Sequence, residues 1–354
     1  MSSRIKSWIM CTLAFFAACL VITVPAHAVD GKKVFLLYDM EGVTGADTAG
    51  DYDTTSPDYS RVRQSLTDDV NAAIAGLKKA GVTEIIISDG HASGNDKGPD
   101  YIVEQIPAGA HFEIRSKPYD PYVDVLDKSF DALVLIGYHA RGGSTSGFTP
   151  HTYFGTIQWE MNGMKMSETS EVGIYAASLG VPLILVSGDD VHKGQVAEFT
   201  KAEYVVVKKA ISATKAEPRD RDTVSAELTA AAERGFRNRK SIGYYKIPPI
   251  LTNKWIFPYA ELTAMASNYP GVTIENDKTL VYTSNSYKDS LAAYTHVSNI
   301  VRYFSDHLIV EALQNSPGGA DKVRELRRSL PPRDYTPTDK PLYVDNKLAT
   351  WGYE

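Results

Sequence analysis

Cysteine is scarce in this chain of 354 residues, which has only two. Both of them, Cys11 and Cys19, lie in an apolar stretch near the amino terminus that reads as a removable export signal. The mature chain would therefore have no thiol and no disulfide. Its fold must depend on its hydrophobic core alone, in an oxidising compartment where disulfides would otherwise be available. With 43% hydrophobic residues the chain can bury such a core.

An excess of positive charge is also missing. The formal net charge is −6, and the 37 lysines and arginines are scattered without a basic stripe interleaved with aromatic residues. A nucleic-acid-binding protein would need such a surface to neutralise phosphates. The composition therefore excludes nucleic acid as an expected partner and favours a soluble enzyme.

The amino terminus has the pattern of a secretory signal peptide. Arg4 and Lys6 precede an apolar run from Trp8 to Val24, and the Ala26-His27-Ala28 sequence then provides a cleavage site. A membrane anchor is the competing interpretation, but the run is at the short limit of about 17 residues for a span. Processing as a lipoprotein at Cys19 is a weaker alternative, because the usual leucine is missing. We expect a periplasmic or secreted protein with no stable membrane insertion after cleavage.

Apolar runs alternate with helical patterns over most of the chain, which predicts an α/β fold. The sheet should be mixed or mainly parallel, with helices on both faces. The runs read as buried strands over residues 34–38, 85–88, 132–137 and 182–186, and the helical patterns cover residues 61–80, 171–179 and 222–234.

The pattern changes after Pro248-Pro249. Aromatic residues alternate from Trp255 to Tyr259, a hairpin is expected around residues 272–282, and a helix is expected over residues 287–304. We interpret this part as a smaller α+β lobe. The predicted organisation is a signal peptide (1–28), a catalytic domain (29–247), the smaller lobe (248–304) and a proline-rich extension of unknown role (305–354).

Carboxylates and histidines follow three of the predicted strands. The first strand runs into Asp39 and Glu41, the second into His91, and the third into His139. The carboxyl ends of strands in an open α/β sheet line one crevice, so these side chains should converge. Oxygen and imidazole ligands without a thiolate suit a catalytic zinc site. Asp39 and Glu41, two residues apart on an extended backbone, would point to the same face.

The chain resembles the zinc D-aminopeptidases of the DppA type. The resemblance rests on several motifs in the family's order and with similar spacing, and it extends from about Lys33 to Phe304. These motifs are Asp39-Met40-Glu41-Gly42-Val43-Thr44-Gly45, Asp89-x-His91, Gly137-Tyr138-His139-Ala140-Arg141, His151, and the segment from Val181 to Asp190.

The resemblance implies a site with two zinc ions per subunit. Asp39 would bridge the two metals, Glu41 and His91 would complete one site, and His139 and Glu168 would complete the other. The family usually has glycine on either side of this glutamate, whereas Ser167 and Thr169 flank it here. Glu171 lies three residues further along the same helical face and is the alternative ligand; the spacing from His139 favours Glu168.

His151 follows a breaker-rich loop, Gly147-Phe148-Thr149-Pro150, in which an imidazole can face the crevice without binding metal. In the resembling family this histidine lies beside the metals, which implies acid-base or nucleophilic assistance. A group whose pKa is near neutrality suits that task. The competing interpretation is a hydrogen bond that only anchors the loop.

The function implied by the resemblance is hydrolysis of short peptides that begin with a D-amino acid, such as D-alanine peptides from cell-wall turnover, by a ring-shaped homo-oligomer. The sequence does not reveal the preference for D over L residues. Two other classes remain open. Asp39 together with Asp189-Asp190 imitates the acidic residues of haloacid-dehalogenase-like phosphatases, although magnesium has little use for three histidines. A periplasmic solute-binding protein would suit the two lobes but would need no cluster of metal ligands.

Overall fold

A computed structural model describes residues 32–54, 56–91, 99–113, 125–152, 157–257, 259–303 and 317–318. The predicted signal peptide, both cysteines and nearly all of the predicted extension lie outside the described residues. Within the described ranges, no helix is long and apolar enough to span a membrane.

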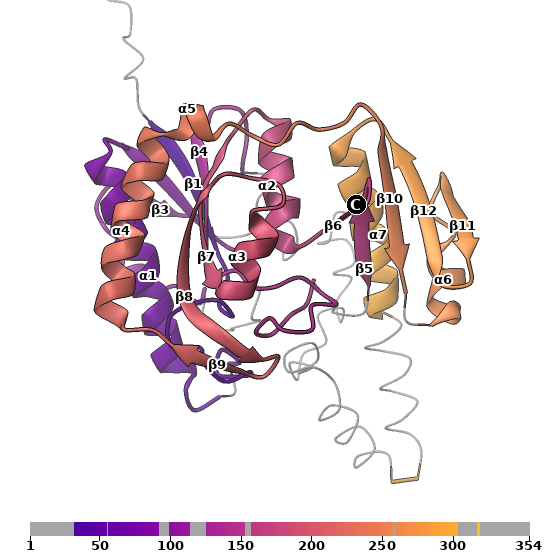
Figure 1. The fold of residues 1–354 in the computed structure, drawn as a ribbon, viewed down its shortest axis with the longest axis horizontal. Coiled ribbons are helices and arrows are strands. Elements are labelled where there is room, and N and C mark those ends of the chain that lie inside the picture. Colours follow the sequence, from indigo (N-terminus) through magenta and orange to yellow (C-terminus); the bar gives the residue numbers. More distant parts are fainter. Residues whose placement is uncertain are drawn as a thin grey trace, which may run out of the picture. The chain divides into compact units, whose positions relative to one another are not determined.

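The larger of two sheets has the strand order β3-β2-β1-β4-β7-β8-β9 (Figure 1). All neighbouring pairs are parallel except β8 and β9, which form an antiparallel pair at one edge. The predicted α/β fold with a mixed sheet is therefore confirmed. The strands are β1 (Lys33–Tyr38), β2 (Glu84–Asp89), β3 (Ala110–Phe112), β4 (Ala132–Ile136), β7 (Leu183–Asp189), β8 (Glu203–Ser212) and β9 (Lys215–Pro218).

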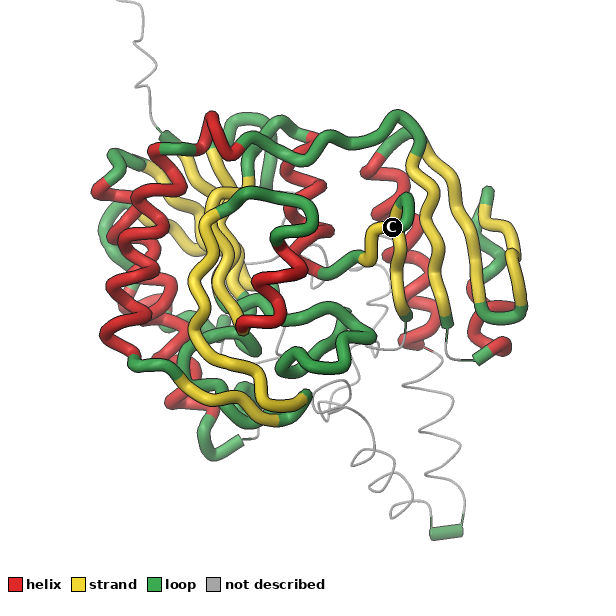
Figure 2. The backbone as a smooth tube through the Cα atoms, viewed as in Figure 1, coloured by secondary structure: helices red, strands yellow, loops and turns green. Residues whose placement is uncertain are grey.

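The central strands are apolar throughout because both faces of the sheet are covered. In β1, Val34 and Leu36 pack into one core cluster, and Phe35 and Leu37 pack into a second cluster on the opposite face. Each such side chain contributes about 1.5–3 kcal/mol by leaving water. Helices α1 (Tyr59–Lys79) and α4 (Arg221–Arg237) cover the first face, and α2 (Glu168–Ser178) and α3 (Asp190–Val196) cover the second (Figures 1 and 2).

Helices α1 and α4 approach each other closely at Gly76. A Cβ atom on Gly76 would lie 2.0 Å from the backbone oxygen of Thr229, so only glycine fits at this crossing. Two short helices complete this part of the chain, the 3-10 helix η1 (Val103–Gln105) and α5 (Arg239–Ile242).

The smaller sheet is antiparallel, with the order β11-β12-β10-β5-β6. Its strands are β5 (Gln158–Met161), β6 (Met164–Lys165), β10 (Leu251–Ile256), β11 (Val272–Asn276) and β12 (Thr279–Ser284), and it is accompanied by α6 (Ala260–Ala266) and α7 (Tyr287–Tyr303). The hairpin and the helix expected after residue 248 are both present. Two strands come from before α2, however, so this sheet combines segments on both sides of the boundary predicted at residue 248.

Helix α2 begins three residues earlier than the sequence pattern indicates. Ser167 caps it, because its side chain accepts a hydrogen bond from the backbone N–H of Ser170 and the Ser170 hydroxyl accepts one from the backbone N–H of Ser167. Glu168 is consequently the first helical residue. In the first turn of α2, the backbone oxygen of Glu171 accepts a hydrogen bond from the Tyr287 hydroxyl of α7, 3.0 Å away, which joins α7 to α2.

Candidate metal centre

The three predicted ligand segments converge at the carboxyl ends of β1, β2 and β4. Asp39 follows β1 directly, and its backbone N–H donates to the oxygen of Ile136 at the end of β4, 2.8 Å away. Two glycines allow the segments to lie this close. A Cβ on Gly42 would lie 1.9 Å from the backbone oxygen of Tyr138, and a Cβ on Gly137, whose φ is +80°, would lie 2.2 Å from that of Asp39. The glycines flanking the ligands are therefore required by packing.

Six buried or nearly buried side chains form one cluster, and they are the six residues that the sequence predicts as the site: Asp39, Glu41, His91, His139, His151 and Glu168. Their potential ligand atoms fall into three groups, and within each group the atoms lie within 4.8 Å of one another. The groups are Asp39 with Glu41 and His91, Asp39 with His139 and Glu168, and Glu41 with His139 and His151. Asp39, Glu41 and His139 each belong to two of the groups, so the groups adjoin, and the Asp39 carboxylate is shared by the group of His91 and the group of Glu168.

Individual distances show how tightly the cluster is packed. Nε2 of His139 lies 3.4 Å from Oδ2 of Asp39 and 3.6 Å from Oε2 of Glu168, and Nε2 of His91 lies 3.8 Å from Oε1 of Glu41. These separations are longer than direct hydrogen bonds with good geometry, and they are short enough for one cation to contact both partners.

All three histidine rings are anchored through Nδ1, which turns Nε2 toward the carboxylates. Nδ1 of His91 lies 2.8 Å from the Asp100 carboxylate. Nδ1 of His139 lies 3.0 Å from the backbone oxygen of Ala140, and Nδ1 of His151 lies 2.8 Å from that of Thr149. A carbonyl oxygen can only accept, so we assign the Nδ1 proton to His139 and His151 from these contacts. When these two rings are neutral, as in a metal complex, each Nε2 presents a lone pair toward negatively charged oxygens, an arrangement that a bound cation stabilises.

The electrostatics of the cluster also favour bound positive charge. Burial lowers the pKa of His139, but the charge of Glu168 and the contact with Asp39 outweigh burial and raise that pKa well above its usual value. Nε2 of His139 is buried and makes no hydrogen bond with the described residues. For Asp39, burial raises the pKa, but its contacts with Glu41 and His139 outweigh burial and lower it. The residues present fit a metal such as zinc, which binds nitrogen and carboxylate oxygen.

Glu168 and Glu171 have different surroundings although they share a helix. Glu168 extends toward His139 and His151, whereas Glu171 is fully buried, belongs to none of the three groups, and lies near Tyr287 and Tyr294 of α7. The geometry therefore brings Glu168, the residue favoured by spacing, into the cluster.

The amino end of α2 is further held by His192 of α3, which the sequence analysis did not single out. Nε2 of His192 lies 2.8 Å from the hydroxyl of Thr169, and its Nδ1 lies 3.1 Å from the hydroxyl of Tyr204. Burial, and then the positive charges of His139 and Arg141, hold the pKa of His192 well below its usual value. A neutral His192 thus orients the residue next to Glu168.

Asp100 is a second residue that sequence reasoning missed. It is fully buried, and its carboxylate contacts Nδ1 of His91 while accepting a hydrogen bond from the Tyr59 hydroxyl. Arg63 also donates to the backbone oxygen of Asp100, 2.7 Å away. A carboxylate behind a metal-binding histidine fixes its tautomer and ring orientation. No periodicity or strand end marks Asp100, so only the fold reveals it.

His151 lies inside the cluster although it belongs to a loop. Its ring stacks on that of His139, with centroids 3.9 Å apart and planes inclined by 10°, and its Nε2 lies 3.5 Å from Oε1 of Glu41. Its backbone N–H donates to the oxygen of Ala140, 3.1 Å away. The sequence places this histidine apart from the strand ends, whereas in space it adjoins two of the expected ligands.

The acidic pair Asp189-Asp190 is engaged in local structure. Asp189 caps α3 by accepting from the backbone N–H groups of Val191 and His192, and Asp190 accepts from the backbone N–H of Ala210, 2.8 Å away. Neither aspartate joins the metal-ligand groups found among the described residues. The late acidic pair required by the phosphatase interpretation is therefore engaged in capping α3 and in a side-chain hydrogen bond to β8.

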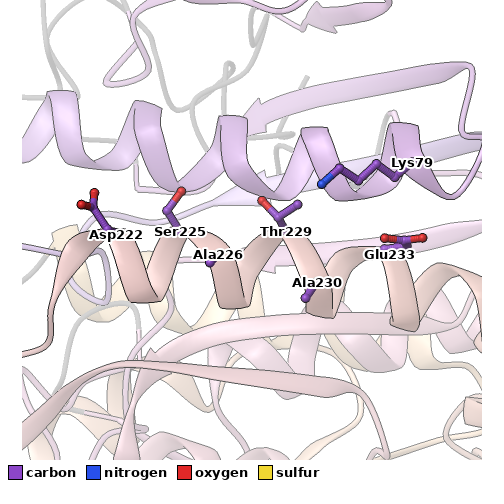
Figure 3. A pocket seen from close by; sticks show the side chains of 7 residues that line it. All are labelled: Lys79, Asp222, Ser225, Ala226, Thr229, Ala230 and Glu233. Carbon is purple, nitrogen blue, oxygen red and sulfur yellow. The ribbon is translucent and has the colours of Figure 1, made fainter.

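A surface groove of about 420 Å³ lies between α1 and α4 and contains none of the six clustered side chains. Figure 3 shows its lining, which consists of Lys79, Asp222, Ser225, Ala226, Thr229, Ala230 and Glu233. Its small, polar lining offers no catalytic constellation, so the cluster at the strand ends is the candidate site.

Comparisons with known proteins place the chain in a family. The sequence model of a family described as D-aminopeptidase matches residues 32–295. The chain is similar to the D-aminopeptidase of Bacillus subtilis (strain 168), with 27% identity over 269 residues, covering 74% of this chain and 94% of the relative. Its fold is similar to a solved structure described as the Zn-dependent D-aminopeptidase DppA from Bacillus subtilis, a self-compartmentalizing protease. The TM-score is 0.69 with 22% identity, and the match covers 76% of this chain and 97% of that one.

Proposed function

Because the chain belongs to the D-aminopeptidase family, we propose that it is a zinc-dependent aminopeptidase that removes an N-terminal D-amino acid from short peptides. One observation carries the proposal: Asp39 is shared by two adjacent groups of potential ligands, as a site with two metals requires. The solved structure with a similar fold is described as Zn-dependent, which supports zinc as the metal.

In this proposal Asp39 would be shared by two zinc ions, Glu41 and His91 would hold one of them, and His139 and Glu168 would hold the other. Zinc bound there would supply Lewis acidity, polarising the scissile carbonyl and making water a better nucleophile near neutral pH. Around the metals, Asp100 orients His91, and the carbonyls of Ala140 and Thr149 orient the other two rings. The protein thus supplies a prearranged set of ligands.

We assign His151 the catalytic role. Its Nδ1 proton is held by the Thr149 carbonyl, so Nε2 is the atom that exchanges a proton, and this atom faces the carboxylates of Glu41 and Glu168. Such a group can accept a proton during attack on the carbonyl and return it to the leaving amine.

The substrates we propose are D-alanine peptides of the kind that cell-wall turnover produces. The export signal at residues 1–28 would bring the enzyme to the periplasm or the outside of the cell, where such peptides occur. We further propose a ring-shaped homo-oligomer, since the solved structure with this fold is described as self-compartmentalizing. Amino-terminal sequencing of the exported protein tests the location: Val29 should be the first residue, and a retained Met1 on a cytoplasmic protein would contradict export.

Metal analysis combined with a panel of matched D- and L-aminoacyl amides tests the function. We expect two zinc ions per subunit, hydrolysis that stops when a chelator removes them, and higher kcat/KM for the D series. Hydrolysis of phosphate esters with bound magnesium would instead favour the phosphatase. A protein that binds peptides without metal or turnover would favour the solute-binding class.

A further inference from the structure

Lys208 of β8 is fully buried, which is rare for a lysine. We infer that Lys208 is a positioning residue that holds together the two loops of the candidate site. These are the ligand loop, residues 39–46, and the His151 loop, residues 147–152. The expected effect on catalysis rests on the proposed function. The contacts of Lys208 with the two loops do not depend on it.

The Lys208 ammonium makes two hydrogen bonds to the ligand loop. Nζ donates to the backbone oxygen of Glu41, 2.8 Å away, and to the backbone oxygen of Ala46. One donor thus spans the loop from a predicted metal ligand to the loop's end. A buried backbone oxygen needs a donor, and Nζ supplies one to each of these two oxygens.

The same ammonium contacts the His151 loop. Nζ lies 4.7 Å from the centroid of the Phe148 ring, a cation–π contact that is strong when shielded from water. Phe148 is fully buried and stands three residues before His151. The next residue, Thr149, has φ of +40° and donates its backbone N–H to the oxygen of Ala213 in the turn between β8 and β9. The β8–β9 hairpin therefore supports the His151 loop at two points.

The charge on Lys208 is not explained by an ion pair. No carboxylate of the described residues lies within 4 Å of Nζ, although Asp47, Asp189 and Asp69 are near enough to act on it through their charges. Burial lowers the pKa of Lys208 to about 8, against the effect of these carboxylates. An apolar side chain of similar volume would fill the space without this desolvation cost. The contacts of the ammonium with the two loops explain why a charged side chain is buried at this position.

The test replaces Lys208 with methionine, which keeps the length of the side chain and removes the donor. Val207→Ala is the matched control, because Val207 is the neighbouring residue of β8, is fully buried, and packs into the core on the opposite face. Hydrogen–deuterium exchange is measured on the metal-free proteins, and zinc affinity by competition with a chelator. The turnover number, kcat, is measured at saturating zinc.

We expect Lys208→Met to raise amide exchange in residues 39–46 and 147–152 above that of the rest of the chain. Zinc should bind about 10–100-fold more weakly, the range found when a group that orients a ligand is lost, and kcat should fall. Val207→Ala should lower the melting temperature, spread any change in exchange over the sheet, and retain zinc affinity. Lys208→Met behaving like Val207→Ala in exchange and in zinc affinity would overturn the inference.

If Lys208→Met does not fold, Phe148→Leu provides the test, because it removes only the ring beneath the ammonium. Exchange at residues 149 and 151 should then rise while that at residues 42 and 43 stays unchanged; no local change would overturn the inference. The exchange measurement needs no zinc, so it separates the two hypotheses. A parent protein without zinc or peptidase activity would contradict the proposed function, whereas unaltered loops in the variants would contradict the role of Lys208.

Discussion

Oδ2 of Asp100 lies 2.8 Å from Nδ1 of His91, and both side chains are buried. This contact turns Nε2 of His91 toward Glu41. Asp100→Asn keeps the shape of the side chain but removes the charge that holds the ring in one tautomer. We expect zinc affinity to fall by about 10–100-fold, measured by competition with a chelator.

Asp131→Asn is the control for this change. The Asp131 carboxylate accepts a hydrogen bond from the backbone N–H of Lys33, at the opposite end of β1. This variant should leave zinc affinity unchanged. Equal zinc binding by the Asp100 variant and the parent would show that the Asp100 contact does not orient the ligand.

Replacing Asp39 and replacing His91 should release different numbers of zinc ions. Asp39 belongs to two ligand groups and His91 to one, so Asp39→Ala should release both zinc ions, whereas His91→Ala should release mainly one. His139→Ala should also lose zinc and activity. Zinc per folded subunit, determined by elemental analysis after dialysis, distinguishes these outcomes. Two bound zinc ions and normal hydrolysis in Asp39→Ala would refute the assignment of the bridge.

Glu168 and Glu171 provide a matched pair on one helix. Glu168→Gln should lower zinc occupancy and turnover, because Glu168 faces His139 and His151. Glu171→Gln should retain zinc and change mainly the melting temperature, because Glu171 lies at the contact between α2 and α7. Zinc content and thermal melting of both proteins test this. The reverse pattern would move the ligand to Glu171.

The strand ends were predictable from sequence because two signals coincide there. A buried parallel strand is marked by an unbroken apolar run, such as Ala132–Ile136, and a polar residue in the short segment after it lies at the carboxyl end of the sheet. Asp39, His91 and His139 carry both signals. The predicted start of α2 was less accurate. The helix begins where Ser167 and Ser170 form reciprocal hydrogen bonds, and the apolar periodicity gives no sign of them.

Asp100, His192 and Lys208 could not be found in this way, because each acts through a contact that the fold alone creates. Lys208 touches a backbone oxygen 167 residues earlier in the chain, and nothing in its own segment distinguishes it from the exposed Lys209. The pairing of β5 with β10 is also between segments far apart in the chain, and it unites segments that composition would separate. These residues support the ligands, and their roles can be recognised only from the tertiary structure.

The catalytic role of His151 is tested by separating metal binding from proton transfer at its Nε2, which lies near the carboxylates of Glu41 and Glu168. This histidine belongs to one group of potential ligands, with Glu41 and His139, yet its ring is stacked on His139 and held by its own loop. If it assists the chemistry, His151→Ala should retain both zinc ions and lose kcat by roughly 10²–10⁴-fold, as expected for loss of a general acid or base.

The decisive comparison uses kcat on a D-aminoacyl amide and the zinc content of the same preparation. Loss of one zinc together with turnover would make His151 a ligand, since its Nε2 lies 3.5 Å from Oε1 of Glu41. A change confined to KM would indicate a binding residue, because uniform binding leaves kcat unaltered. Full zinc with full kcat would leave only the bond from Nδ1 to Thr149, and His151 would then serve to anchor its loop.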